Sequence, residues 1–95
     1  MRAAALMSDS AGDIQKIIAG IEYKRGDKVR LKLSGRGTDA MDLLMDDKIA
    51  TIEIFFTDYE DNLHVAVTLD DDPGQEMRRD LGLYLYFKPN EIELI

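Results

Sequence analysis

Alternating apolar and polar residues predict that most of the chain is β-structure. Residues 28–33 are the clearest case, with Val29, Leu31 and Leu33 on one side of a strand and three cations on the other. A half-buried strand has this period of two because successive side chains point to opposite faces. The same pattern recurs downstream with many β-branched and aromatic residues. The five expected strands are residues 28–33, 49–56, 63–69, 83–87 and 92–95.

The second and third of these strands predict a hairpin. When their apolar faces are matched, Phe56 pairs with Leu63 and Ile54 pairs with Val65. Register in a half-buried hairpin is set by this match, because a slip of one residue would turn every side chain to the other face. The pairing leaves residues 58–61 as a four-residue loop, a common length.

The same register directs several large side chains away from the core. Phe55 is expected opposite His64 on the outer face, and the alternation in residues 83–87 turns Tyr84 and Tyr86 outward. Aromatic side chains on an exposed sheet face are typical of a protein interface. The alternative is that another part of the chain covers this face.

Two helices are expected beside the strands. A helix over residues 10–22 is predicted by isoleucines at helical spacing, Ile14, Ile17, Ile18 and Ile21. A helix this short is unstable alone. It must therefore dock on its own domain, over Phe55, or on a partner chain. If the partner is a second copy, the result is a homo-oligomer. Thr38 begins a second short helix over residues 39–45, and residues 88–91 predict a single 3₁₀ turn.

Together these elements predict a mainly β fold. It is a small five-stranded SH3-like barrel over residues 25–95, with an N-terminal helix and a short helix between strands 1 and 2. Residues 1–9 are expected to be a disordered start. A closed barrel is favoured over a flat sheet because closure removes exposed edges. Ninety-five residues are enough for one domain only.

Composition excludes several classes of function. The chain has no cysteine, which rules out disulfides, thiolate metal sites and cysteine nucleophiles. No apolar run approaches the roughly 20 residues that span a bilayer. We therefore expect a soluble, cytoplasmic protein with no membrane partner.

Charge is distributed unevenly along the chain, whose net charge is −7. Residues 1–36 hold eight Lys/Arg against four Asp/Glu, whereas residues 37–95 hold four against fifteen. Nucleic-acid binders carry a basic surface because phosphate neutralisation supplies much of their affinity. The acidic balance counts against such a partner. A KOW/SH3-like RNA- or ribosome-associated module, using the basic strand 28–32, stays as an alternative.

Two groups of residues are candidates for metal binding or catalysis. Asp70, Asp71 and Asp72 suggest a metal or small-ligand sensor, but consecutive residues on an extended segment point in different directions, whereas a hard cation needs converging oxygens. His64 is the only histidine, and no spacing gives it a nucleophile to activate or a group to orient it. We therefore expect a protein that is not an enzyme and that holds no cofactor or metal.

An ordered set of short motifs in residues 25–95 resembles a known group of proteins. The motifs are Gly26-Asp27-Lys28-Val29-Arg30-Leu31, Ile49-Ala50-Thr51-Ile52, His64-Val65-Ala66-Val67, Asp70-Asp71-Asp72-Pro73-Gly74 and Tyr86-Phe87-Lys88-Pro89-Asn90-Glu91-Ile92-Glu93. The set is similar to a small bacterial family of uncharacterised proteins or appended domains encoded with nickel–iron hydrogenases and their maturation factors. The resemblance implies an accessory role by contact with a hydrogenase subunit or maturation factor. It supplies no catalytic residues.

The sequence thus predicts a non-enzymatic protein–protein interaction module linked to nickel–iron hydrogenase assembly or function. The RNA-associated module and the metal or small-ligand sensor are the alternatives. The residues expected to contact a partner are Phe55, His64, Asp70, Asp71, Asp72, Tyr84 and Tyr86.

Overall fold

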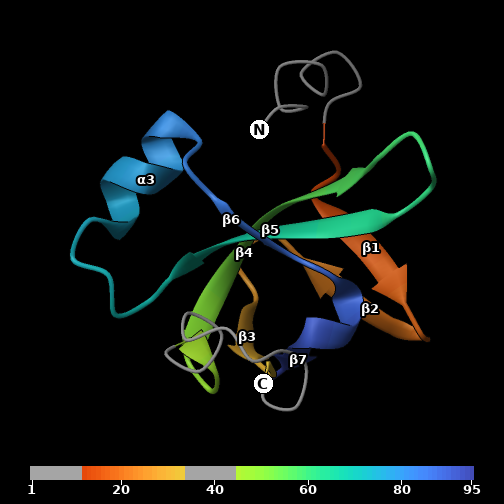
Figure 1. Ribbon diagram of the computed structural model, residues 1–95, viewed down its shortest axis with the longest axis horizontal. Coiled ribbons are helices and arrows are strands. Elements are labelled where there is room, and N and C mark those ends of the chain that lie inside the picture. Colours follow the sequence, from red (N-terminus) through yellow and green to blue (C-terminus); the bar gives the residue numbers. More distant parts are fainter. Residues whose placement is uncertain (1–11, 34–44) are drawn as a thin grey trace.

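The computed structural model describes residues 12–33 and 45–95, and within them β-structure dominates (Figure 1). A two-stranded sheet pairs β1 with β2, and a five-stranded antiparallel sheet has the order β6-β5-β4-β3-β7. The elements are β1 (Gln15–Ile18), β2 (Ile21–Lys24), β3 (Lys28–Leu31), β4 (Ile49–Thr57), β5 (Leu63–Leu69), α3 (Gln75–Leu81), β6 (Leu85–Phe87), the 3₁₀ turn η1 (Pro89–Glu91) and β7 (Ile92–Leu94).

The mainly β class and the five expected strands are confirmed, but the closed barrel is wrong. Strands β6 and β7 form the two edges of an open sheet. The predicted 3₁₀ turn, η1, links these two edge strands along the chain. Each edge strand has only three residues, and each pairs only with its neighbour in the sheet, so hydrogen bonding among the described strands does not close into a barrel.

A bulge in β4 changes which side chains reach the core. Ala50, Thr51 and Ile52 pair with β5 in the register that the apolar faces predict, but the register shifts by one residue between Ile52 and Ile54. A bulge of this kind lets one strand carry an extra residue opposite its partner. Glu53 is that residue, and beyond it Phe55 pairs with Val65. The predicted pairs past the bulge are therefore wrong by one position.

The bulge turns Phe55 inward and Phe56 outward. Phe55 is fully buried, whereas Phe56, now opposite His64, is half-buried on the other face. The expected hairpin loop also lengthens, because Thr57 pairs with Leu63. The prediction that Phe55 lies on the outer face, opposite His64, is wrong for this reason.

The predicted N-terminal helix is a β-hairpin instead. Strands β1 and β2 meet with Ile18 opposite Ile21, and the two residues between them, Ala19 and Gly20, have φ values of 51° and 82°. Two consecutive positive φ angles make the type of turn whose twist matches a two-residue hairpin. Ile17 consequently points away from Ile18 and is 72% exposed, so the isoleucines do not form one stripe.

This hairpin completes the edge of β4 that β3 leaves free. Strand β3 pairs with residues 49–51 only. Beyond them, the backbone of Asp13 exchanges two hydrogen bonds with Phe55, at 2.9 and 3.0 Å. Gly12 lies so close to Ile54 that a Cβ atom would collide with its side chain, which explains the absence of a side chain at that position. The N-terminal segment thus joins the main sheet through backbone bonds.

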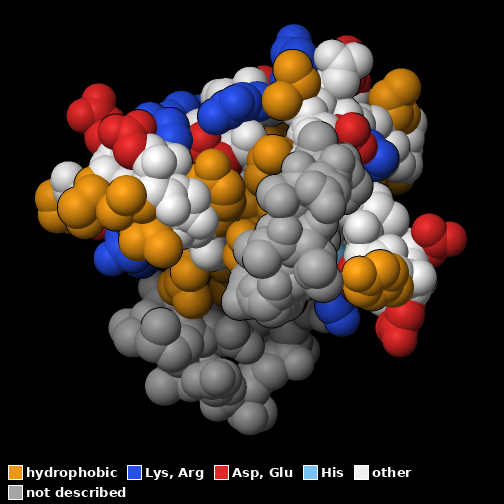
Figure 2. Space-filling model, turned by 90° about the horizontal axis from the view of Figure 1, so that it is seen from above, with side chains coloured by type: hydrophobic (Ala, Val, Ile, Leu, Met, Phe, Trp, Pro, Cys, Tyr) orange, Lys and Arg blue, Asp and Glu red, His pale blue; other side chains and the backbone are white. Residues whose placement is uncertain are grey.

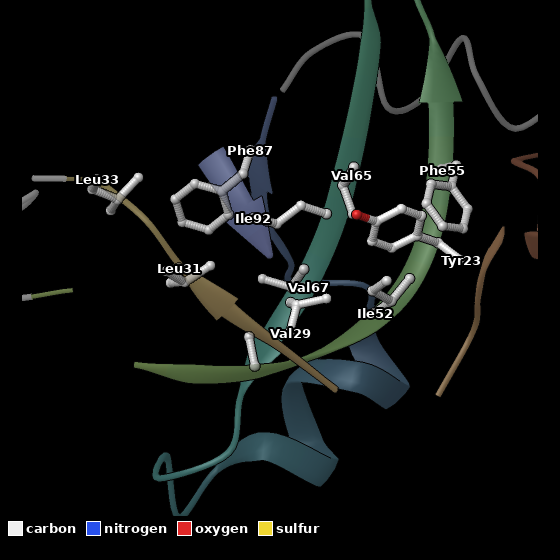
Figure 3. Packing of buried hydrophobic residues seen from close by; sticks show 11 residues of the cluster. Tyr23, Val29, Leu31, Leu33, Ile52, Phe55, Val65, Val67, Phe87 and Ile92 are labelled. Carbon is white, nitrogen blue, oxygen red and sulfur yellow. The ribbon is translucent and has the colours of Figure 1, made fainter. Parts of the chain in front are cut away.

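One hydrophobic cluster holds the hairpin and the sheet together (Figure 3). The hairpin contributes Tyr23, which is 6% exposed and enters the same cluster as Phe55. The predicted inward residues Val29, Leu31 and Leu33 are all buried in it. The cluster comprises Tyr23, Val29, Leu31, Leu33, Ala50, Ile52, Phe55, Val65, Val67, Phe87 and Ile92.

The remaining predictions concern the second helix and the orientation of the residues near β6. The helix predicted over residues 39–45 falls largely on residues outside the described part of the chain. Between the strands expected at residues 63–69 and 83–87 lies a helix, α3, that the sequence pattern did not reveal. After it, Leu83 and Leu85 were expected to face the core, but both are exposed.

The bulge leads to a prediction about two adjacent residues. Phe55→Ala should lower the free energy of unfolding by about 3–5 kcal/mol, because it leaves a cavity in the core. Phe56→Ala should cost less than about 2 kcal/mol, because its ring is already partly solvated. Urea unfolding followed by circular dichroism measures both. Equal losses, or a larger loss for Phe56→Ala, would contradict the bulged register.

Candidate protein-interaction surface

Helix α3 is fixed at both ends by its own turns. At its start, one carboxylate oxygen of Asp72 accepts a hydrogen bond from the Gly74 amide at 2.8 Å, and the other accepts one from Arg78 Nε at 2.6 Å. At its end, Gly82 adopts a left-handed conformation with φ of 70°, which only glycine takes without strain. The Leu83 amide then bonds back to the Arg78 carbonyl at 2.8 Å. The helix has a defined position despite having only seven residues.

The side of α3 that faces the sheet is polar. Arg79 Nε donates to Glu53 Oε2 at 2.7 Å, and the Thr68 hydroxyl donates to the same oxygen at 2.7 Å. Gln75, one turn before Arg79, donates to Thr68 at 3.1 Å and to Asp70 at 3.0 Å. Glu53 is only 2% exposed. A buried carboxylate is costly without partners, and here an arginine and a hydroxyl satisfy it.

The apolar side chains of α3 face solvent, among charged ones. Met77 and Leu81, one turn apart, are 57% and 63% exposed, and no residue of the helix is buried. A surface helix ordinarily has the opposite arrangement, with its apolar side against the core. Leu83 and Leu85 follow and are also exposed. Figure 2 shows hydrophobic side chains gathered on the α3 side of the molecule, at the left of that view.

A hollow of about 340 Å³ adjoins these residues. It lies where β6 stops, since β6 pairs with β5 only at Val65–Val67. Its walls are mainly apolar, and the ion pair between Asp72 and Arg78 lies on its border. The lining residues are Met45, Val67, Thr68, Leu69, Asp72, Arg78, Leu83 and Leu85. We call Met77, Leu81, Leu83, Leu85 and this hollow the α3 surface.

The aromatic face that the sequence predicts exists in altered form. Phe55 is buried and cannot touch a partner. Phe56 takes its place, with its ring centroid 5.6 Å from that of Tyr86, and Tyr84 continues the row at 6.5 Å from Tyr86. All three rings are half-buried. They form a small cluster over the outer face of β4 and β6 that presents less free surface than the α3 surface.

His64 takes part in a local structural contact. Its Nε2 atom lies 2.9 Å from Asp58 Oδ2, while Asp58 Oδ1 accepts hydrogen bonds from the amides of Glu60 and Asn62. The hydrogen bond with His64, followed by that with the Asn62 amide, lowers the pKa of Asp58 to about 2. This group of contacts shapes the loop between β4 and β5.

The three consecutive aspartates have separate partners. Asp70 pairs with Lys28 at 2.9 Å, Asp71 with Lys48, and Asp72 with Arg78. The part of the chain that the structure describes holds no cluster of three or more His, Asp or Glu side chains arranged to bind a metal ion. Asp72 thus belongs to the border of the α3 surface, whereas Asp70 belongs to the polar contacts beneath α3.

The cations of the basic strand are also paired. Lys28 contacts Asp70, Arg30 lies 3.9 Å from Asp47, and Lys32 lies 3.9 Å from Glu93. Acidic side chains from later in the sequence therefore neutralise the strand. It offers a polyanion much less positive charge than its sequence suggests.

Comparisons with known proteins add no assignment to this geometry. No family model matches the chain, and no match was found among curated proteins or solved structures. Within residues 12–33 and 45–95, no helix is long and apolar enough to cross a bilayer.

The polar attachment of α3 can be tested by removing its arginine. Arg79→Met should lower the free energy of unfolding by about 2 kcal/mol, because it leaves the Glu53 carboxylate buried with one partner fewer. Loss of a fully buried ion pair would cost more, but a third of the Arg79 side chain is exposed. Arg78→Met, which breaks a more exposed pair, should cost less than about 1 kcal/mol. Adding Glu53→Gln to Arg79→Met should recover part of the loss. A double variant no more stable than Arg79→Met would contradict the account.

The low pKa of Asp58 predicts a pH dependence of stability. Because the folded value of about 2 lies below the reference value of 3.8, the contribution of Asp58 is present above about pH 4 and is lost as pH falls towards 2. Thermal unfolding of the wild type and of Asp58→Asn across this range checks it. The difference between their melting temperatures should shrink on acidification, and a constant difference would refute the assignment.

Proposed function

We propose that this chain is a non-enzymatic protein-interaction module whose partner docks on the α3 surface. The observation that carries the proposal is the inverted orientation of α3. Its polar side satisfies a buried carboxylate, while Met77 and Leu81 face solvent. Contiguous exposed apolar side chains are costly in a soluble protein, and where they gather they typically mark a binding site.

The partner that we propose is a nickel–iron hydrogenase subunit or maturation factor in the cytoplasm. Support for this partner comes from the motif resemblance of residues 25–95. The RNA-associated alternative is less well supported, because Lys28, Arg30 and Lys32 are each paired with an acid. The metal-sensor alternative is less well supported because each of the three consecutive aspartates already has a cation beside it.

The proposal predicts which exposed residues control partner binding. The full chain carrying Met77→Ser and Leu81→Ser should recover a hydrogenase subunit or maturation factor at least tenfold less well than the wild type, since buried apolar anchors dominate interfaces. The assay is affinity capture from cells expressing a hydrogenase operon, read by quantitative mass spectrometry.

A matched control comes from the hairpin. Ile17 is 72% exposed and belongs to β1, which lies at the right of Figure 1, whereas α3 lies at the left. Ile17→Ser should therefore leave recovery unchanged. Tyr84→Ser should reduce recovery of the partner less than the Met77→Ser, Leu81→Ser variant does, or leave it unchanged. Unchanged recovery with the α3 variant, or a loss as large with Ile17→Ser, would refute the proposed docking surface.

A further inference from the structure

Electrostatic features of the α3 surface restrict what can dock there. Glu76 and Asp80 are exposed on α3, one turn apart, beside the apolar pair Met77 and Leu81. Among the described residues neither acid has a cation within ion-pairing distance. The hydrogen bond with Glu53 raises the pKa of Arg79, and the charges of Glu76 and Asp80 add smaller contributions in the same direction. The apolar ridge is therefore flanked by two carboxylates that make no ion pair with a described residue.

The arginines of α3 make their ion pairs with other acids. Arg78 is held by Asp72 at 2.6 Å and Arg79 by Glu53 at 2.7 Å. Like charges one turn apart also destabilise a helix slightly. A cation supplied by a partner would remove that repulsion, and it would do so at the rim of the surface, where charge guides encounter and orientation.

The shape of the surface favours a helix as the docking element. The ridge of Met77 and Leu81 runs along α3, and the hollow of about 340 Å³ begins at Arg78 of the same helix and continues to Leu83 and Leu85. A helix that carries apolar side chains every three or four residues can lay some of them along the ridge and insert one into the hollow. Its polar side then comes close to Glu76 and Asp80.

We infer that the α3 surface binds an amphipathic helix of another protein whose apolar side is flanked by lysine or arginine. This inference rests on the proposed function and adds the chemistry of the partner. Charge complementarity selects this occupant over a second copy of the chain. In a symmetric dimer through this surface, two acidic flanks and two chains of net charge −7 would be brought together.

Designed peptides test the inference with the full-length chain. Two fluorescein-labelled helical peptides share the same leucine side and differ only in having lysine or glutamate on the flanks. Fluorescence anisotropy should show the lysine peptide binding at least tenfold more tightly than the glutamate peptide, with a difference that shrinks between about 50 and 200 mM salt. Equal binding of the two peptides would overturn the inference.

Charge reversal on the protein separates local from general attraction. Glu76→Lys with Asp80→Lys should weaken the lysine peptide about tenfold and favour the glutamate peptide. The matched control is Glu22→Lys with Glu60→Lys, which makes the same change in net charge at exposed positions on the hairpin and the β4–β5 loop. This control should still bind the lysine peptide more tightly than the glutamate peptide. Similar losses in both variants would mean non-specific attraction and would overturn the inference.

The remaining outcomes distinguish this inference from the proposed function. Met77→Ser with Leu81→Ser should weaken the lysine peptide at least tenfold. If neither peptide binds while capture of a hydrogenase component still depends on Met77 and Leu81, the inferred helix chemistry is wrong and the proposed function stands. If sedimentation shows a dimer that Leu81→Ser dissociates, a second copy occupies the surface and the inference is wrong.

Discussion

The extra residue in β4 is the constraint on which the rest of the structure depends. Two successive side chains, Glu53 and Ile54, lie on the same face of the sheet because the register shifts between Ile52 and Ile54. Phe55 can then fill the core next to the hairpin, where Tyr23 meets it. Glu53, at the bulge itself, lies on the outer face, where α3 covers its carboxylate. Bulges commonly redirect side chains in this way, and here the bulge determines which aromatic ring fills the core, next to the residue that holds α3.

The attachment in turn explains why α3 is inverted. A buried carboxylate requires donors, and α3 supplies one to Glu53 through Arg79. Gln75, on the same inner side of the helix, donates to the Thr68 hydroxyl, which is the other donor to Glu53. The remaining positions of a helix with only seven residues must then face outward, apolar ones included. The exposed apolar ridge is therefore a direct result of the polar contact beneath it. The residues before the helix favour a loop, and the Asp72 turn fixes where the helix begins. The Gly82 turn fixes where it ends.

The strands could be predicted from the sequence because burial on one face imposes a period of two, as in residues 28–33. The bulge could not, because the apolar pattern in residues 49–56 is continuous and either Phe55 or Phe56 would satisfy it. The helix prediction over residues 10–22 failed because isoleucine spacing fits a helix while Ala19-Gly20 also permits a tight turn. Helix α3 went unrecognised because its inward residues are polar, so no apolar stripe marks it.

Charged residues that are far apart in the sequence lie side by side in the folded protein. The basic and acidic portions of the chain are separate in sequence, yet Lys28, Arg30 and Lys32 each lie beside an acid from later in the chain. Strand β3 therefore does not carry the isolated positive charge that the sequence suggests. The unbalanced negative charge of the protein lies at specific places, and the flank of α3 is one of them.

The polar contact beneath α3 also has a thermodynamic consequence. Because the helix buries none of its side chains, its release from the sheet would expose little additional apolar surface. Such an opening would have a small heat-capacity change and a weak dependence on denaturant. It would also be among the low-energy local openings of a domain. Cooling weakens hydrophobic contacts but would leave this attachment largely intact, so α3 and the core would respond differently to temperature.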